Sequence, residues 1–310
     1  MAGQKPVVVV GSINTDLVAV TSRIPVVGET IFGKDFQIHP GGKGANQAVA
    51  VGRLGYPVRL IGRLGNDAFG SQLRTHLTSA GVDIAGVATS EGASGVAVVV
   101  VSDDGENIIV VTPGANANVT PQDLDTNLEI IRQAGIVLAQ LEIPLETVEH
   151  LAGICSREGV PLILDPAPAR ELPSGIFKHI HWLTPNETEA AFFTGMAGLD
   201  PAEIANVILN KGSRGVVLKM GGHGAFLAAK TGFAESVIAF PVKAIDTTAA
   251  GDAFNGGFAT ALMLGKSPLE SAQFANAVAG ISVTRAGAQP SMPSMAEVEA
   301  FLEKELVRNH

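Results

Sequence analysis

Two aspartates bracket a run of small side chains in the stretch D-T-T-A-A-G-D-A-F-N-G-G, which runs from Asp246 to Gly257. A β-rich segment ends at Asp246 and helical periodicity begins around Ala253, so residues 249–251 are predicted at a helix N-terminus. Backbone N–H groups there lack helical partners and the helix dipole is positive, which favours a bound anion. Small side chains and the conformational freedom of Gly251 let a phosphate approach the backbone. The stretch therefore predicts a phosphoryl-transfer site.

Asp252 lies inside this predicted anion site, where a carboxylate is electrostatically costly unless it has a task. It could take the proton from a substrate hydroxyl while that oxygen attacks a γ-phosphoryl group, with the helix N-terminus stabilising the transferred charge. The alternative is a structural aspartate in the first turn, which stabilises a helix by about 0.3–1 kcal/mol. The stretch by itself leaves both interpretations open.

A second glycine-rich stretch, G-G-K-G-A-N-Q-A, runs from Gly41 to Ala48 and places Lys43 among glycines, which is hard to explain as structure. It does not complete G-x-x-x-x-G-K-[ST], and it lacks the third glycine of a dinucleotide fingerprint. Walker-type and Rossmann nucleotide sites are therefore disfavoured.

Composition indicates a globular α/β protein. The chain has 310 residues, 46% hydrophobic and 16% charged, with 36 glycines, which suits a buried parallel sheet with many tight turns. A formal net charge of −9 with scattered basic residues argues against a nucleic-acid partner. Cys155 is the only cysteine and no stretch approaches about 18 consecutive apolar residues, which predicts a cytoplasmic protein without a membrane segment.

Short apolar runs recur along the chain, with amphipathic stretches between them. Runs that are apolar on both faces predict βαβ units, and hence a doubly wound, mostly parallel α/β sheet flanked by helices. We expect one domain over residues 1–310, with helices dominating after Ala249. The predicted strands lie at residues 7–10, 58–61, 136–139, 161–164, 182–183 and 216–218.

Two regions, residues 15–39 and 95–112, break this rhythm and indicate short strands joined by turns. In the second, Asp104-Gly105 between apolar runs is a hairpin signal. We interpret both regions as a small antiparallel β lid that projects from the main body. The run Val96–Val101 is apolar throughout, so it is either a core strand or covered by the site on one face and another subunit on the other. The second interpretation is favoured, and it predicts a homodimer through the lid.

Together, the stretches at Gly41 and Asp246 resemble the two signature motifs of the ribokinase-like (PfkB) carbohydrate kinases. Similar stretches occur along the whole chain: G-S-I-N-T-D at Gly11, G-N-D-A-F-G at Gly65, T-P-G-A-N-A at Thr112, D-P-A-P-A-R at Asp165, T-P-N-E-T-E-A at Thr184 and T-R-A-G-A-Q-P-S at Thr284. The resemblance implies a ribokinase-like fold and ATP-dependent phosphorylation of D-ribose at O5. The alternatives are a kinase of the same family for fructose, deoxyribose, 2-keto-3-deoxygluconate or a nucleoside such as adenosine, and a non-catalytic sugar-binding regulator.

The resemblance also implies site residues. Asp252 matches the catalytic base, and Ala249, Ala250 and Gly251 match an anion hole of backbone amides. The positions that match sugar-binding residues are Asn14, Asp16, Gly42, Lys43, Asn46 and Glu142, together with Asp252 itself. Converging carboxylates and carboxamides suit the hydroxyls of a pentose, although Asn14 and Asp16 could simply end a strand in a turn.

For the nucleotide, the resemblance implies an ATP site and a Mg²⁺ ion near Asn186 and Glu189, with Glu189 acting through water. Asn186 and Glu189 also fit a helix capping box, and the two roles can coexist. A plain hairpin turn is the rival for residues 219–224, where His223 is more typical of a solvent-facing residue. The implied ATP-binding positions are Asn186, Lys219, Gly221, Gly222, His223, Gly224, Gly251, Asp252 and Asn276. Asn276 departs from the histidine that the family often places near adenine, which bears on base contacts and not on the chemistry.

Finally, the resemblance implies potassium as an activator, enclosed mostly by backbone oxygens. The matching positions are Asp246, Thr248, Ser282, Arg285, Gly287 and Ser291. Asp246 would then fix the loop that forms the anion hole. Its alternative role is a hydrogen bond to its own turn.

Overall fold

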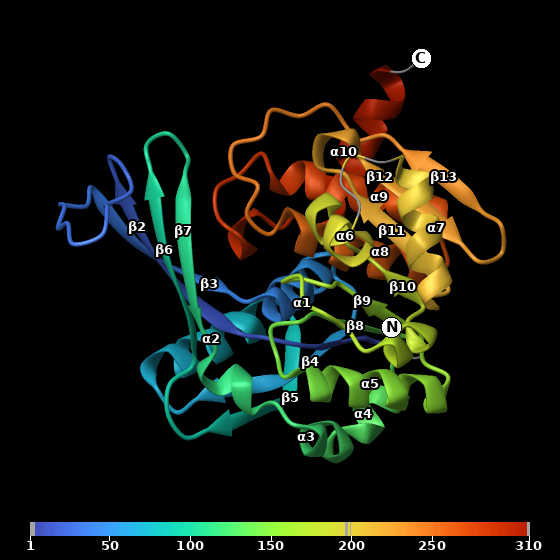
Figure 1. The fold of residues 1–310 in the computed structure, drawn as a ribbon, viewed down its shortest axis with the longest axis horizontal. Helices are drawn as coiled ribbons and strands as arrows, with labels where there is room; N and C mark the ends of the chain where they lie inside the picture. The colour runs from blue at the N-terminus through green and yellow to red at the C-terminus, as the bar shows by residue number, and fades with distance from the viewer. Residues whose placement is uncertain (1–3, 196–197, 199, 309–310) are drawn as a thin grey trace.

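A nine-stranded sheet forms the centre of the molecule, with helices on both faces (Figure 1). The structure is a computed structural model and describes residues 4–195, 198 and 200–308. The strand order is β13-β12-β11-β10-β9-β8-β1-β4-β5, and all pairs from β11 to β5 are parallel. The strands are β1 (Val7–Val10), β4 (Val58–Gly65), β5 (Val82–Ser90), β8 (Ile136–Ala139), β9 (Leu162–Leu164), β10 (Trp182–Leu183), β11 (Gly215–Lys219), β12 (Ala225–Ala229) and β13 (Ala234–Val237). The predicted doubly wound, mostly parallel sheet is confirmed.

The central strand β1 is apolar at every position because both of its faces are buried. Its valines are fully buried, and alternate residues enter different cores: Val7 and Val9 pack into one, Val8 and Val10 into the other. A parallel strand between two helical layers has no wet face, so every position is apolar. The antiparallel strands β12 and β13 at one edge were not predicted.

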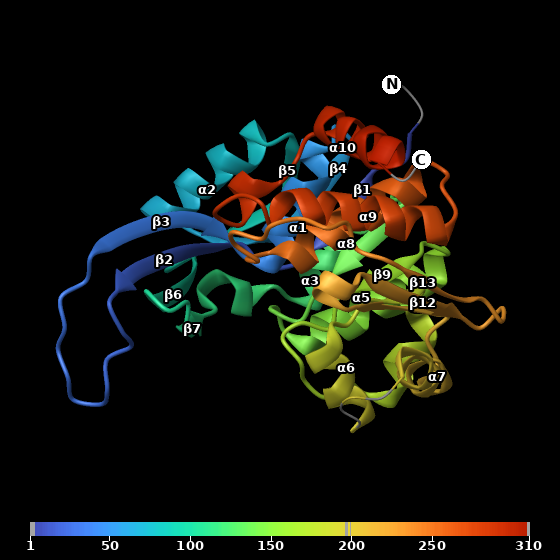
Figure 2. The same ribbon diagram turned by 90° about the horizontal axis from the view of Figure 1, so that it is seen from above.

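Two helical layers sandwich the sheet, as Figure 2 shows from above. The first layer consists of α1 (Lys43–Arg53), α2 (Ala68–Ser79), α8 (Ala250–Met263), α9 (Pro268–Ser282) and α10 (Met295–Arg308). The second consists of α3 (Pro121–Thr126), α4 (Leu128–Arg132), α5 (Leu145–Glu158), α6 (Glu187–Thr194) and α7 (Pro201–Lys211). Short 3₁₀ turns are η1 (Gly114–Asn118), η2 (Ser174–His179), η3 (Gly221–His223) and η4 (Gln289–Ser291). Within the described ranges, no helix has both the length and the apolar character needed to cross a bilayer.

A separate four-stranded sheet projects from this body (Figure 1). Its strands, in spatial order, are β3 (Asp35–Gly41), β2 (Asn14–Thr21), β6 (Gly95–Ser102) and β7 (Asn107–Thr112). The predicted hairpin turn is confirmed, with Gly105 at a φ of 86° between β6 and β7. Because β6 belongs to this lid sheet, it is not a strand of the main core. The sheet is antiparallel in its outer pairs, whereas β2 and β6 pair in parallel, since both strands lead outward from the body.

The fold gathers polar residues at one edge of the main sheet. Glu142 follows β8, Asp165 follows β9 and Lys219 ends β11, all at the carboxyl ends of parallel strands. The N-termini of α1 and α8 reach the same edge, where open α/β sheets bind their ligands. The lid faces this edge, and residues of both line one cavity.

Candidate active site

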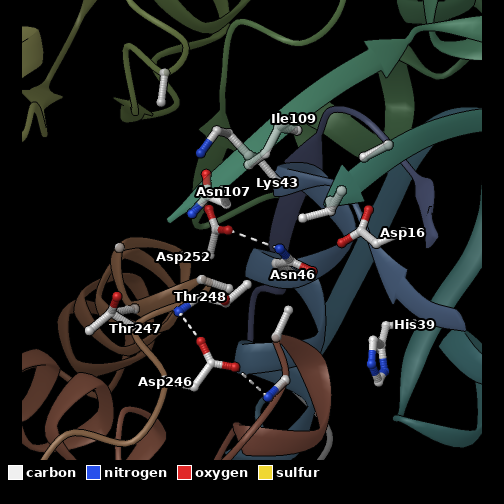
Figure 3. Close-up of a pocket in the computed structure, with 18 of the residues that line it drawn as sticks. Asp16, His39, Lys43, Asn46, Asn107, Ile109, Asp246, Thr247, Thr248 and Asp252 are labelled. Atoms are coloured by element: carbon white, nitrogen blue, oxygen red, sulfur yellow. Dashed lines mark hydrogen bonds between the residues drawn. The ribbon is translucent and has the colours of Figure 1, made fainter. Parts of the chain in front are cut away.

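A cavity of about 1230 Å³ lies between the lid and the carboxyl edge of the main sheet. Figure 3 shows the pocket, with Lys43 and Asn46 of α1, Asn107 and Ile109 of β7, and Asp252 of α8 around it. A second cavity of about 330 Å³ continues from it. The residues that line both cavities are Lys219, Gly221, Thr247, Ala250 and Gly251.

The turn before α8 leaves backbone donors open to the cavity. Ala249 adopts the left-handed conformation, with a φ of 58°, which is uncommon for a residue with a side chain and marks a constrained turn. No protein group of the described residues accepts a hydrogen bond from the backbone N–H of Gly251 or Asp252. A Cβ added at Gly251 would lie 3.3 Å from Lys219 Nζ, so an ammonium group adjoins this turn. The turn and the lysine together form a site for an anion.

Asp252 lies at this turn, only 3% exposed, and two amides of α1 hold its carboxylate. Asn46 Nδ2 donates to one oxygen and Gln47 Nε2 to the other, both at 3.0 Å. Figure 3 shows the first of these bonds. The helices approach closely because Gly256 of α8 has no side chain; a Cβ there would lie 2.5 Å from Ala50 Cβ. Burial chiefly raises the pKa of Asp252 above its ordinary value, and Lys43 opposes that rise.

Lys43 is one of two lysines that line the larger cavity, the other being Lys219. Burial alone would lower the pKa of its ammonium group, but four nearby carboxylates hold that pKa above its ordinary value: Asp252, Asp165, Glu142 and Glu189. The backbone N–H of Lys43 donates to Glu142 Oε2 at 3.1 Å, and Ser12 Oγ donates to the same oxygen at 2.5 Å. Glycine is required just before it, because Gly42 has a φ of 86° and a Cβ would lie 2.7 Å from Asn14 N.

Asn14 presents a donor to the cavity because Asn116 fixes the orientation of its amide. Asn116 Oδ1 accepts from Ile13 N at 2.9 Å and its Nδ2 donates to Ile13 O, so its own amide has one possible orientation. Its Nδ2 also donates to Asn14 Oδ1 at 2.7 Å. The Nδ2 group of Asn14 is therefore left for a ligand.

Asp16, two residues along β2, presents carboxylate oxygens to the same cavity. Burial raises the pKa of Asp16 to about 6, and Glu142 and Asp252 add to the shift. Gly41 leaves room for it, since a Cβ there would lie 2.2 Å from Asp16 Oδ2. Asn14 and Asp16 thus offer a donor and an acceptor side by side. The alternative that they end a strand in a turn is wrong, because both lie inside β2, which begins at Asn14.

The predicted nucleotide residues divide between the cavities. Asn186 and Glu189 line the larger cavity, and the capping box is confirmed by reciprocal bonds of 2.8 Å between each backbone N–H and the other side chain. Gly221, Gly222 and Gly224 line the smaller cavity, in the turn between the antiparallel strands β11 and β12. His223 is exposed and lines neither cavity, as expected of a solvent-facing residue.

Asn276 also lines the smaller cavity, but its amide group already has partners. Its Nδ2 lies 3.3 Å from both Val237 O and Ile238 O, so it holds the chain that leaves β13. The side-chain oxygen of Asn276 is the part left for a base.

Asp246 connects the turn before α8, residues 249–251 (the anion turn), to the loop that contains Gly287. Its Oδ1 accepts from Thr248 N at 2.9 Å, as Figure 3 shows. Its Oδ2 accepts from Gly287 N at 2.8 Å. Burial alone would raise the pKa of Asp246, but these bonds lower it. The hydrogen bond to its own turn is therefore present, together with a bridge to the residue-287 loop. Ser282 and Ser291 are buried and bond to backbone oxygens of Ala279 and Ala288, while Arg285 pairs with Glu297 at 2.6 Å.

Comparison with known proteins decides the family. A family model described as pfkB family carbohydrate kinase matches residues 4–295. The chain belongs to this family.

Relatives and solved structures within the pfkB family cover nearly all of the chain. It is 41% identical to a ribokinase of Haemophilus influenzae over 97% of this chain and 99% of that protein. A ribokinase of Bacillus subtilis is 40% identical over 95% and 98% of the two chains. The structure of an Arabidopsis thaliana ribokinase complexed with ribose and ATP superposes with a TM-score of 0.91, at 38% identity over 97% and 99%.

Several residues of this pfkB-family site were not assigned a role from sequence. Asp165 pairs with Lys219 at 2.9 Å, Gln47 contacts Asp252, and Asn116 orients Asn14. Asp165 and Asn116 lie in stretches that resemble the family. Each is a polar residue that follows an apolar run, and this pattern could have marked them as candidate site residues. The contact partners, more than 50 residues away in the chain, were not readable from spacing.

The side-chain oxygens of Asn186 and Glu189 suit a cation that keeps most of its water ligands, and not one bound entirely by protein atoms. Across the residues that the structure describes, no three His, Cys, Asp or Glu side chains converge as a metal cluster. Both Glu189 oxygens already accept from Asn186, at 2.8 and 3.0 Å. Mg²⁺ commonly keeps several waters and binds through one or two carboxylates and substrate phosphates, so these residues fit such an ion.

Proposed function

We propose that the protein phosphorylates D-ribose at O5 with ATP as the phosphoryl donor. The observation that carries this proposal is the position of Asp252, a buried carboxylate at a helix N-terminal turn with unpaired backbone N–H groups. The ribokinase relatives, including the one complexed with ribose and ATP, support the choice of acceptor and donor. Residues 1–310 would act as one ribokinase-like unit, with the lid over the site.

In this proposal each side chain has a task set by its chemistry. Asp252 takes the proton of the attacking hydroxyl, and the 249–251 turn stabilises the transferring phosphoryl group. In this turn the backbone N–H of Gly251 has no protein acceptor among the described residues, whereas that of Ala250 donates to Thr247 O at 3.2 Å. Asn14 donates to a sugar oxygen, whereas Asp16 and Glu142 accept from sugar hydroxyls. Gly42 and Asn46 lie within the same sugar site. The smaller cavity takes the base and ribose of ATP, beside Asn276 and the glycines of the residue-221 turn.

Two cations belong to the proposal. Mg²⁺, held through water by Asn186 and Glu189, would neutralise phosphate charge during transfer. K⁺ would bind beside Asp246, Thr248, Ser282, Arg285, Gly287 and Ser291, where Asp246 already joins the anion turn to the residue-287 loop. Its role would be to hold the anion turn in place. A cytoplasmic location stays a prediction from the lone, buried Cys155.

Measuring ADP release with a panel of acceptors tests this function. Ribose should give the highest kcat/KM, and the product should be ribose 5-phosphate. Preference for fructose, deoxyribose, 2-keto-3-deoxygluconate or adenosine would change the acceptor but keep the reaction. Sugar binding without any acceptor-dependent ADP release would favour a non-catalytic regulator.

Replacing Asp16 with asparagine should weaken ribose binding and, at pH 7, increase the free energy of unfolding. The pKa of Asp16 is about 6 in the fold against 3.8 ordinarily, so the native state keeps a proton that the unfolded chain loses between those values. Its contribution to the free energy of unfolding therefore falls as pH rises from about 4 to about 6. Because the carboxylate is partly open to solvent, we expect Asp16→Asn to be about 1–2 kcal/mol more stable than wild type at pH 7, and equal at pH 4.

Urea unfolding at both pH values and ribose calorimetry measure these effects. Asp103→Asn, at an exposed lid aspartate, is the matched control and should change unfolding by less than about 0.5 kcal/mol. Ribose binding should weaken at least about 10-fold in Asp16→Asn alone. A variant that is equally stable at pH 7, or binds ribose normally, contradicts the assignment.

The lid also supports the proposal of a homodimer. Its residues alternate between faces: Val99, Ile109 and Val111 line the cavity, whereas their neighbours turn outward. The outward side chains are apolar and exposed: Phe36 at 59%, Ile38 at 52%, Val98 at 44%, Ile108 at 47% and Val110 at 59%. A contiguous apolar face on a sheet with open edges is a typical subunit interface.

We therefore expect Val110→Lys to shift the protein from dimer to monomer in sedimentation velocity, because a charge would enter the apolar interface. The loss should exceed about 100-fold in dimer affinity. Val307→Lys, at a more exposed apolar site on α10, should leave the oligomer unchanged. A monomeric wild type would refute the interface.

A further inference from the structure

One side-chain amide connects two buried carboxylates at the bottom of the site. Gln47 Nε2 donates to Asp252 Oδ1 and to Asp165 Oδ2, both at 3.0 Å. Gln47 is fully buried, so water does not compete for these bonds. A primary amide nitrogen has two hydrogens, and each carboxylate receives one.

The two carboxylates fix the orientation of the Gln47 amide, and a second glutamine holds its oxygen. Gln140, also fully buried and just after β8, donates from Nε2 to Gln47 Oε1 at 2.7 Å. If the Gln47 amide were reversed, its oxygen would face two carboxylates and its nitrogen would face a donor. Space for Gln140 comes from Gly11, where an added Cβ would lie 2.1 Å from Gln140 Oε1.

Through Asp165 the network reaches the anion turn. Asp165 Oδ1 pairs with Lys219 Nζ at 2.9 Å, and both side chains are largely buried. Lys219 Nζ lies beside Gly251, where it lines both cavities. A continuous chain of contacts thus runs from the ammonium group of Lys219, beside the anion turn, through Asp165 and Gln47 to the carboxylate of Asp252.

We propose that Gln47 is a positioning residue for phosphoryl transfer, oriented by Gln140, which holds Asp252 in the geometry of a general base and ties it to the Asp165–Lys219 pair. This inference rests on the proposed function. Gln47 does not line the cavity, so it acts through Asp252 rather than on the substrate. Asn46 holds the other oxygen of Asp252, so the loss of Gln47 would free the carboxylate to turn about the remaining bond.

The charged groups around Asp252 make the role of Gln47 measurable. Lys43 faces it from α1, Asp16 from the lid strand β2 and Asp165 from the end of β9. Gln47 is a neutral donor between two negative groups, so its removal leaves Asp252 and Asp165 to repel each other without a bridge. The charged form of Asp252 would then be disfavoured.

The test is a double-mutant cycle with Gln47→Met and Gln140→Met, both of which keep side-chain volume and remove hydrogen bonds. Gln47→Met should lower kcat by about 10- to 100-fold while KM for ribose and ATP changes less than about 3-fold. The acid limb of its kcat/KM profile should move to higher pH. Gln140→Met should show a smaller fall, about 3- to 10-fold, and add nothing in the Gln47→Met background.

Thr147→Val is the structural control, since it removes a buried 2.7 Å bond to Val119 O on the opposite face of the sheet. It should lower the unfolding midpoint without moving kcat or the pH profile. The inference is overturned if Gln47→Met keeps kcat within about 2-fold and its acid limb in place, or if the two glutamine effects multiply. An active wild type with such a result leaves the proposed function standing, whereas an inactive wild type removes both.

Discussion

Asp252→Asn is expected to lower kcat for ribose phosphorylation by about 10³- to 10⁴-fold, with the affinity for ribose changed less than about 3-fold. The carboxylate is the buried acid at the anion turn, held by Asn46 and Gln47, and an amide in its place cannot accept a proton. The sugar keeps its contacts with the lid and with Glu142. Ribose-dependent ADP release gives kcat, and calorimetry without nucleotide gives the affinity.

Stability must be measured in the same variant. Asp252 accepts from two amide donors, so an asparagine has one acceptor too few and would leave a buried donor unpaired, at a cost of about 1–3 kcal/mol. Urea unfolding separates this loss from the loss of chemistry. If the folded variant retains activity within a few-fold of wild type, Asp252 is not the base.

Lys43→Met should have the second-largest effect, at least about 100-fold on kcat/KM for ribose. The ammonium group of Lys43 lies near Asp252, Asp165, Glu142 and Glu189, and it opposes the rise in the pKa of Asp252. Lys219 compensates Asp165 as well. Without it, the base is ionised less readily and the carboxylates repel the incoming phosphate.

The stability of Lys43→Met should depend on pH in a defined direction. Burial raises the pKa values of Asp252 and Glu189, and Lys43 opposes both rises. Removing the cation raises these two folded pKa values further above their unfolded values, so stability is lost as pH rises through the raised values. We expect a small difference from wild type at pH 5 and a loss of about 2–4 kcal/mol at pH 8. Urea unfolding from pH 5 to 8 measures this, with Lys34→Met, an exposed lid lysine, as the control. A loss that is the same at every pH contradicts the role of Lys43.

The parts of the fold that follow from local pattern were predictable. β1 is apolar at all positions because both of its faces are buried. The helix at the anion turn was predicted, although α8 begins at Ala250, inside the run of small residues, and not around Ala253. The lid hairpin followed from Asp104-Gly105, whose turn needs a positive φ. The parallel pairing of β2 with β6 was not predictable, since it depends on how two segments about 80 residues apart leave the body.

In the site, too, features set by local sequence were predictable and features set by distant contacts were not. Asp252 and the turn at 249–251 could be proposed from residue type and position alone. The amides that hold the reactive groups could not, because Gln47 meets Asp252 from 205 residues away and Asn116 meets Asn14 from 102 residues away. Their hydrogen-bond directions are set by tertiary partners, and a buried glutamine in a helix is otherwise indistinguishable from packing.

A crystal structure of the protein with ADP and ribose would show whether Asp252 contacts the attacking hydroxyl. We expect an Asp252 carboxylate oxygen about 2.6–3.2 Å from the ribose O5 hydroxyl, with the 249–251 turn facing the position of the transferred phosphoryl group. If the carboxylate points away from every sugar oxygen while both ligands are bound, Asp252 is not the base and the account is wrong.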